Sequence, residues 1–276
     1  MQLTPLCGAL GAEVSGVDLS QPLDASTAEG IRAAFFEHHV LLFRGQDLSP
    51  ERQIALTELL GAARPHPLNT RRTVEGHPEV LVLENRPGKR GARNDYWHSD
   101  ISHMEEPPLA SLLHAIEIPT GRGDTMFCNM CAAHDQLSPG LRATLAELRA
   151  MHSGEATYRR ALEGGTDALR IDPSQVKPPV SHPVVRTLGE TGRKALFVNP
   201  HFTTEFEGMT REESAPLLQH IYARATAPEN VYRHRWAVGD VVMWDNRATM
   251  HYAVRDYDES MPRYLHRTTA DGERPV

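Results

Sequence analysis

The stretch Tyr96-Trp97-His98-Ser99-Asp100 carries a histidine and a carboxylate two residues apart. If this stretch is a β-strand, both side chains project from the same face of the sheet, because successive side chains alternate between faces. Two such ligands can hold one metal ion. The pair alone is weak evidence, since a chain with 15 histidines contains about one His-x-Asp pair by chance. Its interpretation therefore depends on the rest of the chain.

A second histidine with strand-like neighbours lies near the C-terminus. The segment Trp244-Asp245-Asn246-Arg247-Ala248-Thr249-Met250-His251 supplies it, and Arg263 and Arg267 follow in a further predicted strand. Two imidazoles and one carboxylate form the facial triad that binds non-heme iron(II) and leaves coordination positions open. The same donors also bind zinc, so the residues by themselves leave both metals open.

Length and composition predict a single domain over 1–276, because 40% hydrophobic residues are ample for a packed core. The net charge of -7 argues against a nucleic-acid-binding face. An odd number of cysteines (Cys7, Cys128 and Cys131) in a chain of this size suits a reducing cytoplasm. Residues 1–19 lack the features of a signal peptide, and no apolar run is long enough to span a membrane. We therefore expect a cytoplasmic protein without nucleic-acid or membrane partners.

Four stretches are predicted to be helices. Capping boxes at Ser26–Glu29 and at Thr210–Glu213 open two of them, and Ser49 followed by Pro50 opens another. The fourth has apolar residues at helical spacing. The predicted helices cover 26–38, 50–60, 141–152 and 210–224.

Apolar runs bounded by glycine and proline predict the strands, and a glycine-containing turn at 189–193 predicts a hairpin. The predicted strands cover 40–43, 80–84, 109–118, 183–188, 195–199, 231–238, 241–244 and 263–270. Residues 158–177 are polar and without periodicity, so we expect a mobile lid over about 157–180. The chain is thus mainly β with flanking helices (α+β), and periodicity does not distinguish a jelly roll from another sandwich.

In the order of these motifs, the chain resembles the taurine dioxygenase family of iron(II)- and 2-oxoglutarate-dependent oxygenases, which includes phenoxyalkanoate dioxygenases and alkylsulfatases. The resemblance runs from LGAEVSGVDL at 10–19 to YLHRTT at 264–269. It implies a double-stranded β-helix (jelly roll) with His98, Asp100 and His251 as catalytic iron ligands. It also implies iron(II) as cofactor, 2-oxoglutarate and dioxygen as cosubstrates, and a homodimer or homotetramer.

The resemblance assigns further residues to the cosubstrate and the substrate. Thr125 and Arg263 would bind the distal carboxylate of 2-oxoglutarate, a task that suits the planar guanidinium. Arg267 lies four residues beyond Arg263, returns to the same face of a strand, and matches the arginine that holds the substrate anion. The other matching substrate-pocket positions are His66, Asn69, Asn94, Thr157, Tyr158 and Phe202.

The expected reaction is hydroxylation of a small anionic compound, namely a sulfonate such as taurine, an alkyl sulfate or an aryloxyalkanoate, with release of succinate and carbon dioxide. Asn69 stands where taurine dioxygenase has a tyrosine, so the pocket is enlarged and taurine itself is left open. A zinc-dependent hydrolase is the alternative enzyme, but it leaves Thr125, Arg263 and Arg267 unexplained. A non-catalytic jelly-roll anion-binding protein would have no need of open metal positions.

Overall fold

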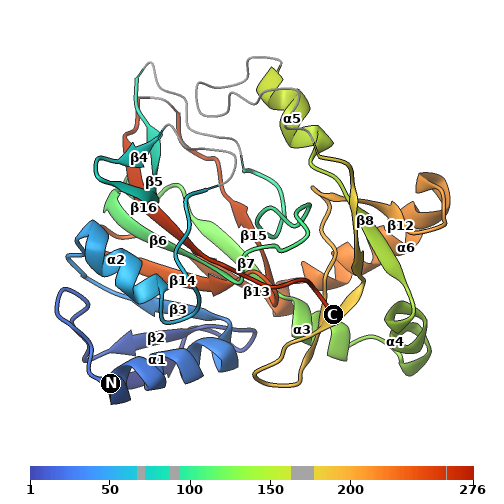
Figure 1. The fold of residues 1–276 in the computed structure, drawn as a ribbon, viewed down its shortest axis with the longest axis horizontal. Coiled ribbons are helices and arrows are strands. Elements are labelled where there is room, and N and C mark those ends of the chain that lie inside the picture. The colour runs from blue at the N-terminus through green and yellow to red at the C-terminus, as the bar shows by residue number, and fades with distance from the viewer. Residues whose placement is uncertain (67–71, 88–93, 163–176, 259) are drawn as a thin grey trace.

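A computed structural model of the protein describes residues 1–66, 72–87, 94–162, 177–258 and 260–276, and its architecture is mainly β with flanking helices (Figure 1). The largest sheet has eight strands in the order β1-β2-β3-β14-β6-β16-β5-β4. All of its pairs are antiparallel except β2 with β3. Their bounds are β1 Gln2–Pro5, β2 Ala12–Ser15, β3 Val40–Phe43, β4 Thr73–Val74, β5 His77–Asn85, β6 Ala110–Glu117, β14 Val241–Asp245 and β16 Arg263–Ala270.

The central strands of this sheet are buried on both faces. In β14, Val241 and Met243 belong to a core cluster that includes residues of α1 (Ala25–His38) and α2 (Pro50–Thr57). Val242 and Trp244 alternate with them and join a cluster on the other face. Such burial requires continuous apolar runs, which is why these strands were readable in the sequence. Figure 1 shows both helices on the outer side of the sheet.

A smaller sheet, in the order β13-β7-β15, covers the inner face of the large one. Its strands are β7 Thr125–Asn129, β13 Val231–His234 and β15 Thr249–Ala253. Phe127 of β7 shares a core cluster with Leu113, Val242 and Leu265 of the large sheet, so the two sheets pack face to face. Residues of both sheets, among them Leu113 and His251, line a common cavity.

The remaining elements form a second lobe around a separate core cluster, on the right of Figure 1. It contains the sheet β12-β8-β9, the hairpin β10-β11 and several helices. The bounds are α3 Met130–Asp135, α4 Pro139–Ala146, β8 Arg149–His152, α5 Glu155–Leu162, β9 Val180–Pro183, β10 Val185–Thr187, β11 Lys194–Leu196, β12 Thr203–Phe206, α6 Arg211–Ala225 and the short 3-10 helix η2 Pro228–Asn230. Among the described residues, no helix has both the length and the apolar character needed to cross a membrane.

Several local predictions are confirmed. Ser49 caps α2 and Pro50 is its first residue. Thr210 and Glu213 form a reciprocal capping box at the start of α6, where the Thr210 N–H donates to Glu213 Oε2 at 2.8 Å. The hairpin is formed by β10 and β11.

Other local predictions are wrong. The helix predicted at 141–152 ends at Ala146, because Arg149–His152 forms β8 and pairs with both β9 and β12. Asp24, rather than Ser26, caps α1, since its carboxylate accepts the Thr27 N–H at 2.8 Å. The second helix stops at Thr57, well before Gly61, and the strand predicted at 231–238 stops at His234.

The segment 96–100 is not a strand. His98 forms an isolated bridge with His251, and Asp100 begins a turn that continues through Ile101 at a φ of 37°. The lid predicted over about 157–180 begins within α5, which occupies Glu155–Leu162, and its mobility stays a prediction. The rest of that segment, 163–176, and the predicted pocket residue Asn69 lie outside the described residues.

Candidate active site

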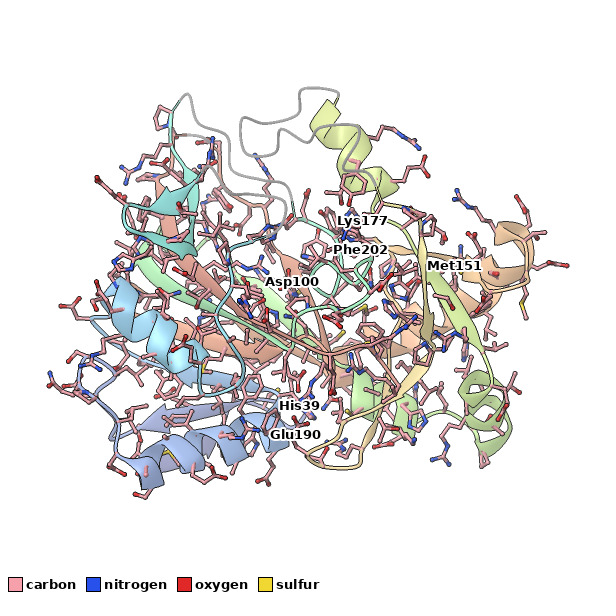
Figure 2. The ribbon with its side chains drawn as sticks, viewed as in Figure 1. His39, Asp100, Met151, Lys177, Glu190 and Phe202 are labelled. Atoms are coloured by element: carbon pink, nitrogen blue, oxygen red, sulfur yellow. The ribbon has the colours of Figure 1, made fainter. Side chains whose placement is uncertain are left out.

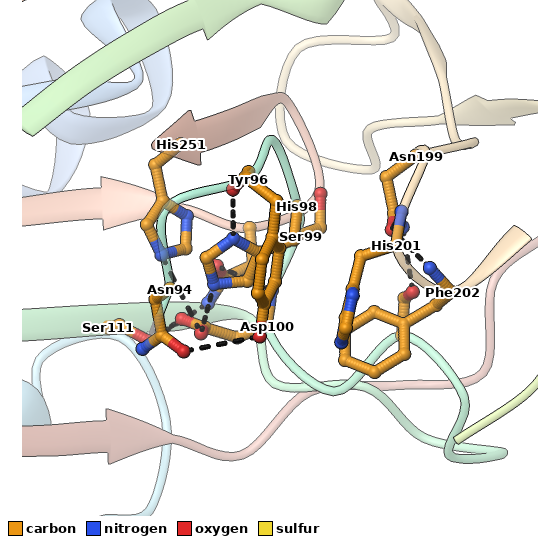
Figure 3. A network of polar contacts seen from close by, with 12 residues as sticks. Asn94, Tyr96, His98, Ser99, Asp100, Ser111, Asn199, His201, Phe202 and His251 are labelled. Carbon is orange, nitrogen blue, oxygen red and sulfur yellow. Dashed lines mark hydrogen bonds and ion pairs between the residues drawn. The ribbon is translucent and has the colours of Figure 1, made fainter. Parts of the chain in front are cut away.

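The side chains of His98, Asp100 and His251 converge between the two sheets (Figure 3). One potential ligand atom from each lies within 4.8 Å of the other two. Asp100 Oδ1 is 3.9 Å from His98 Nε2 and 3.7 Å from His251 Nε2. All three residues are buried. The predicted convergence is therefore present, although a bridge and a turn produce it rather than a strand.

Backbone and ring contacts hold the two histidines in place. The His98 N–H donates to the His251 carbonyl at 3.0 Å, and the His251 N–H donates to the His98 carbonyl at 2.8 Å. His98 Nδ1 is 2.9 Å from the Tyr96 carbonyl. Because a carbonyl only accepts, Nδ1 carries the proton and donates, which leaves the lone pair of Nε2 directed at the cluster.

The electrostatics of the cluster favour two neutral imidazoles and one carboxylate. Burial lowers the pKa of His98 and of His251. Burial alone would raise the pKa of Asp100, but Arg267, the two histidines and Ser111 outweigh it and hold that pKa well below its usual range. These protonation states are the ones a divalent metal requires of its ligands.

The two distances from Asp100 Oδ1 are short enough for one ion to be shared with each histidine. Two atoms that are each about 2.1 Å from the same ion lie at most about 4.2 Å apart. Both distances from Asp100 Oδ1 satisfy this limit. The cluster has three donors, and a facial set of two histidines and one carboxylate leaves room for further ligands.

The second oxygen of Asp100 is held by two donors. Ser111 Oγ on β6 and Arg267 Nη2 on β16 each lie 2.7 Å from Asp100 Oδ2. Arg267 is buried, and its Nε has no hydrogen-bond partner in the part of the chain that the structure describes. Arg267 is thus at the site, as predicted, with part of its guanidinium still available to an anion.

A cavity of about 90 Å³ adjoins the cluster. His251, Thr125, Arg263 and Arg267 all line it, as does the predicted pocket residue Asn94. The two arginines therefore face the same space, as their four-residue spacing on β16 predicts.

Thr125 and Arg263 each have a hydrogen-bond donor that an anion could use. Trp236 Nε1 donates to Thr125 Oγ1 at 3.0 Å, so the hydroxyl proton of Thr125 remains free to be donated elsewhere. Arg263 has a buried Nε without a hydrogen-bond partner among the described residues. Burial lowers its pKa while the adjacent Tyr257 raises it, and the Tyr257 ring centroid is 5.8 Å from the guanidinium carbon.

Three other predicted substrate residues, His66, Asn94 and Thr157, lie near the cluster or contact residues beside it. Burial, assisted by nearby Arg267, lowers the pKa of His66 to about 4, so this side chain is neutral and close to the cluster. Asn94 Oδ1 accepts from the Tyr96 hydroxyl at 3.3 Å. Thr157 Oγ1 on α5 is 2.9 Å from His201 Nε2.

An aromatic wall stands next to His98. We use this name for Tyr96, His103, Tyr158, His201 and Phe202. Figure 3 labels three of its members, Tyr96, His201 and Phe202, and Figure 2 marks where Phe202 and Asp100 lie in the molecule. The rings of Tyr96 and His201 stack at 3.8 Å between centroids, and Phe202 lies 4.4 Å from His201 and 4.7 Å from His103. The Tyr158 hydroxyl is 3.4 Å from His103 Nε2. The predicted residues Tyr158 and Phe202 are thus part of this wall, in contact with His103 and, for Phe202, with His201.

Sequence reasoning missed several members of the site. Arg72 and Tyr257 line the cavity, and Asn246 Oδ1 accepts the Asp100 N–H at 3.4 Å. The others are Tyr96, His103, Ser111 and His201. Ser111 could have been found from the sequence. It is a polar residue within the apolar run 109–118, and a buried serine normally makes a specific hydrogen bond. Three members of the wall were missed. Tyr96 lies only two residues from His98, whereas His103 and His201 come from loops whose approach to His98 no local pattern encodes.

The chain matches known proteins over nearly its whole length. The family model described as "Taurine catabolism dioxygenase TauD, TfdA family" matches residues 2–269. An alpha-ketoglutarate-dependent sulfate ester dioxygenase of Pseudomonas putida is 38% identical, over 100% of this chain and 91% of that protein. An alpha-ketoglutarate-dependent 2,4-dichlorophenoxyacetate dioxygenase of Cupriavidus pinatubonensis is 38% identical, over 96% of each. The crystal structure of a taurine dioxygenase from Burkholderia xenovorans aligns with a TM-score of 0.83 at 36% identity, covering 100% of this chain and 90% of that one.

Proposed function

This chain belongs to the taurine dioxygenase family, and from that premise we propose that it hydroxylates a small anionic organic compound with iron(II), 2-oxoglutarate and dioxygen. We take residues 1–276 as one oxygenase domain with the double-stranded β-helix of this family. The packing of sheet β13-β7-β15 on the large sheet supports this. The functional proposal rests on the cavity beside the three candidate ligands. His251, Thr125, Arg263 and Arg267 all line this cavity.

His98, Asp100 and His251 are the residues that would hold the iron. When bound there, iron(II) supplies the coupling of dioxygen reduction to oxidative decarboxylation of 2-oxoglutarate and to hydroxylation of the substrate. The chain's contribution is to keep both imidazoles neutral by burial and to keep Asp100 ionised through Arg267 and Ser111. A zinc hydrolase would use the same ligands, but it would give no role to Arg263 and Thr125.

Arg263 and Thr125 would bind the distal carboxylate of 2-oxoglutarate. A buried guanidinium nitrogen without a partner is costly, and a carboxylate that accepts from it removes that cost. Thr125 adds one donor, because Trp236 already occupies its oxygen as an acceptor. The cavity then orients the cosubstrate along β16, toward His251.

Arg267, His66 and the aromatic wall would recognise the substrate. Arg267 offers its free Nε to an anionic group, and neutral His66 adds a hydrogen bond without adding charge. Tyr96, His201 and Phe202 present ring surface to the organic part of the molecule. Sulfate esters, aryloxyalkanoates and sulfonates share this combination of an anion and an apolar body.

The test is a panel assay of succinate formation with iron(II), 2-oxoglutarate and dioxygen. The panel contains an alkyl sulfate, an aryloxyalkanoate, taurine and the neutral alcohol that corresponds to the alkyl sulfate. We expect at least one of the anions to stimulate succinate formation strongly and the alcohol to have little effect. Stimulation by none of the anions, or equal stimulation by the alcohol, would contradict the proposed substrate class.

A further inference from the structure

The two oxygens of Asp100 have separate surroundings. Oδ1 faces the two histidines, whereas Oδ2 accepts from Ser111 Oγ and from Arg267 Nη2, both at 2.7 Å. We propose that Ser111, oriented by Asn246, is a positioning residue that presents Asp100 to the metal through Oδ1 alone. This inference rests on the proposed metal site, and it adds two residues that act on the metal through Asp100.

The direction of the Ser111 hydroxyl follows from its neighbours. A hydroxyl has one proton and two lone pairs. Asn246 Nδ2 lies 3.0 Å and Arg267 Nη2 lies 3.1 Å from Ser111 Oγ, and both of these nitrogens only donate. The two lone pairs are therefore occupied, so the single proton is directed to the third neighbour, Asp100 Oδ2.

The amide of Asn246 is fixed in the same way. Its Oδ1 lies 2.9 Å from Trp244 Nε1, which is a donor only, and 3.4 Å from the backbone N–H of Asp100. Its oxygen must therefore face these two groups, and its Nδ2 faces Ser111. A chain of one-directional hydrogen bonds thus runs from Trp244 through Asn246 and Ser111 to Asp100.

The frame that carries this chain is rigid. Ser111 lies in the interior of the large sheet, where β6 pairs with β14 opposite Trp244 and with β16 opposite Thr269. Asn246 is tied by its backbone N–H to the Leu109 carbonyl at 2.9 Å. Ser111 and Asn246 are both almost fully buried, so water does not compete for these bonds.

The consequence for the metal is a carboxylate that offers one oxygen. Chelation through both oxygens would need a lone pair on Oδ2, and both of its lone pairs already accept short hydrogen bonds, one of them from a cation. Holding Asp100 in this way preserves coordination positions that 2-oxoglutarate and dioxygen need. Loss of a hydrogen bond to a metal-ligating group typically weakens metal affinity by about 10- to 100-fold.

The experiment measures Mn(II) binding to the metal-free protein by the loss of the free-ion electron paramagnetic resonance signal. We expect Ser111→Ala to bind Mn(II) at least about tenfold more weakly than the wild type. Ser111→Thr keeps the hydroxyl and should restore most of the affinity, which a purely structural role for this serine would not require. Ser214→Ala is the matched control, because Ser214 is a buried serine that donates to the Thr210 carbonyl in α6.

Asn246→Ala provides a second, independent variant in case Ser111→Ala does not fold, and its Mn(II) affinity should fall in the same direction. Wild-type affinity in folded Ser111→Ala, or in folded Asn246→Ala if that is the variant measured, would overturn the inference. His98→Ala in the same titration separates the two levels of the account. If His98→Ala loses Mn(II) while Ser111→Ala retains it, only the positioning role fails. If His98→Ala retains it, the metal site itself is wrong.

Discussion

At the scale of single residues, the cavity is notable for cations that lack a full set of partners. Arg263 and Arg267 both have a buried Nε without a hydrogen bond to any described residue. Arg267 Nη2 pairs with Asp100, whereas Arg263 has the Tyr257 ring beside it and no carboxylate partner among the described residues. Cations arranged in this way indicate anionic ligands, and the two arginines should respond differently to substitution.

Replacing Arg263 by alanine should raise the concentration of 2-oxoglutarate needed for half-maximal turnover by about a hundredfold or more, because a buried charged hydrogen bond is lost. Thr125→Val should raise it less, since one neutral donor is removed. The measurement is succinate formation against 2-oxoglutarate concentration. Arg211→Ala, which removes an exposed ion pair with Glu205, serves as the control. An unchanged requirement in Arg263→Ala would refute its assignment.

Replacing Arg267 by alanine should abolish substrate-stimulated turnover, while 2-oxoglutarate still binds when iron(II) is saturating. Metal affinity should fall as well, because Asp100 Oδ2 loses a charged donor. Binding of 2-oxoglutarate is followed anaerobically by the metal-to-ligand charge-transfer absorption. If the variant instead lost 2-oxoglutarate and kept its substrate preference, the two arginines would have exchanged roles.

At the scale of elements, the turn before β7 lies against Arg263 and Tyr257 of the candidate cosubstrate site. Gly123 has a φ of +73°, and a Cβ placed there would lie 3.2 Å from Arg263 Nε and 3.3 Å from the Tyr257 ring. Gly121, in the same turn, has a φ of +67° with nothing within 4 Å. The two glycines thus share a left-handed backbone but differ in what they contact.

Gly123→Ala should therefore raise the 2-oxoglutarate requirement by displacing Arg263, and it should also lower the melting temperature. Gly121→Ala should lower the melting temperature through the same backbone strain, with the 2-oxoglutarate requirement unchanged. Thermal unfolding and cosubstrate kinetics of the two variants measure both effects. Equal effects of the two variants on the 2-oxoglutarate requirement would mean that strain alone, rather than contact with Arg263, is responsible.

The elements that were predictable are those whose cause is local. The caps at Ser49 and Thr210 form within one turn of helix, and the β10-β11 hairpin needs only the turn between its strands. The strand Arg149–His152 was mistaken for helix because its partners, β9 and β12, lie about 30 and 50 residues further along the chain. No local pattern reports such pairing.

The features of the site also separate into those with a local cause, which were predictable, and those that depend on distant residues, which were not. The order of His98, Asp100 and His251 was readable, but the geometry that joins them was not, since it depends on a bridge between residues 98 and 251. Ser111 and Asn246 act through hydrogen bonds to groups more than ten and one hundred residues away, respectively. Asn69 and the substrate identity stay predictions.

At the scale of the whole molecule, buried histidines link folding to pH. Burial lowers the pKa of His39, His103 and His182 to about 4 from an ordinary value of 6.5. Between these values the unfolded chain binds protons that the folded chain does not, so stability is lost as pH falls from about 6.5 toward 4. Above 6.5 these groups are neutral in both states, and their effect on the pH dependence vanishes.

We therefore expect the melting temperature of the metal-free protein to fall steadily from pH 6.5 to pH 4.5. Replacing His182 by glutamine should make the decline shallower, because one of the titrating groups is removed. The same change at exposed His220 should leave the slope as it was. A melting temperature that is flat over this range would show that the buried histidines do not titrate as proposed.

The central claim is that His98, Asp100 and His251 together hold iron(II) with positions open for 2-oxoglutarate. Anaerobic addition of iron(II) and 2-oxoglutarate, followed by the metal-to-ligand charge-transfer absorption, tests it most directly. The account predicts that the absorption develops in the wild type and is lost in His98→Ala and in His251→Ala at matched iron concentration. Wild-type absorption and iron affinity in either variant would contradict it.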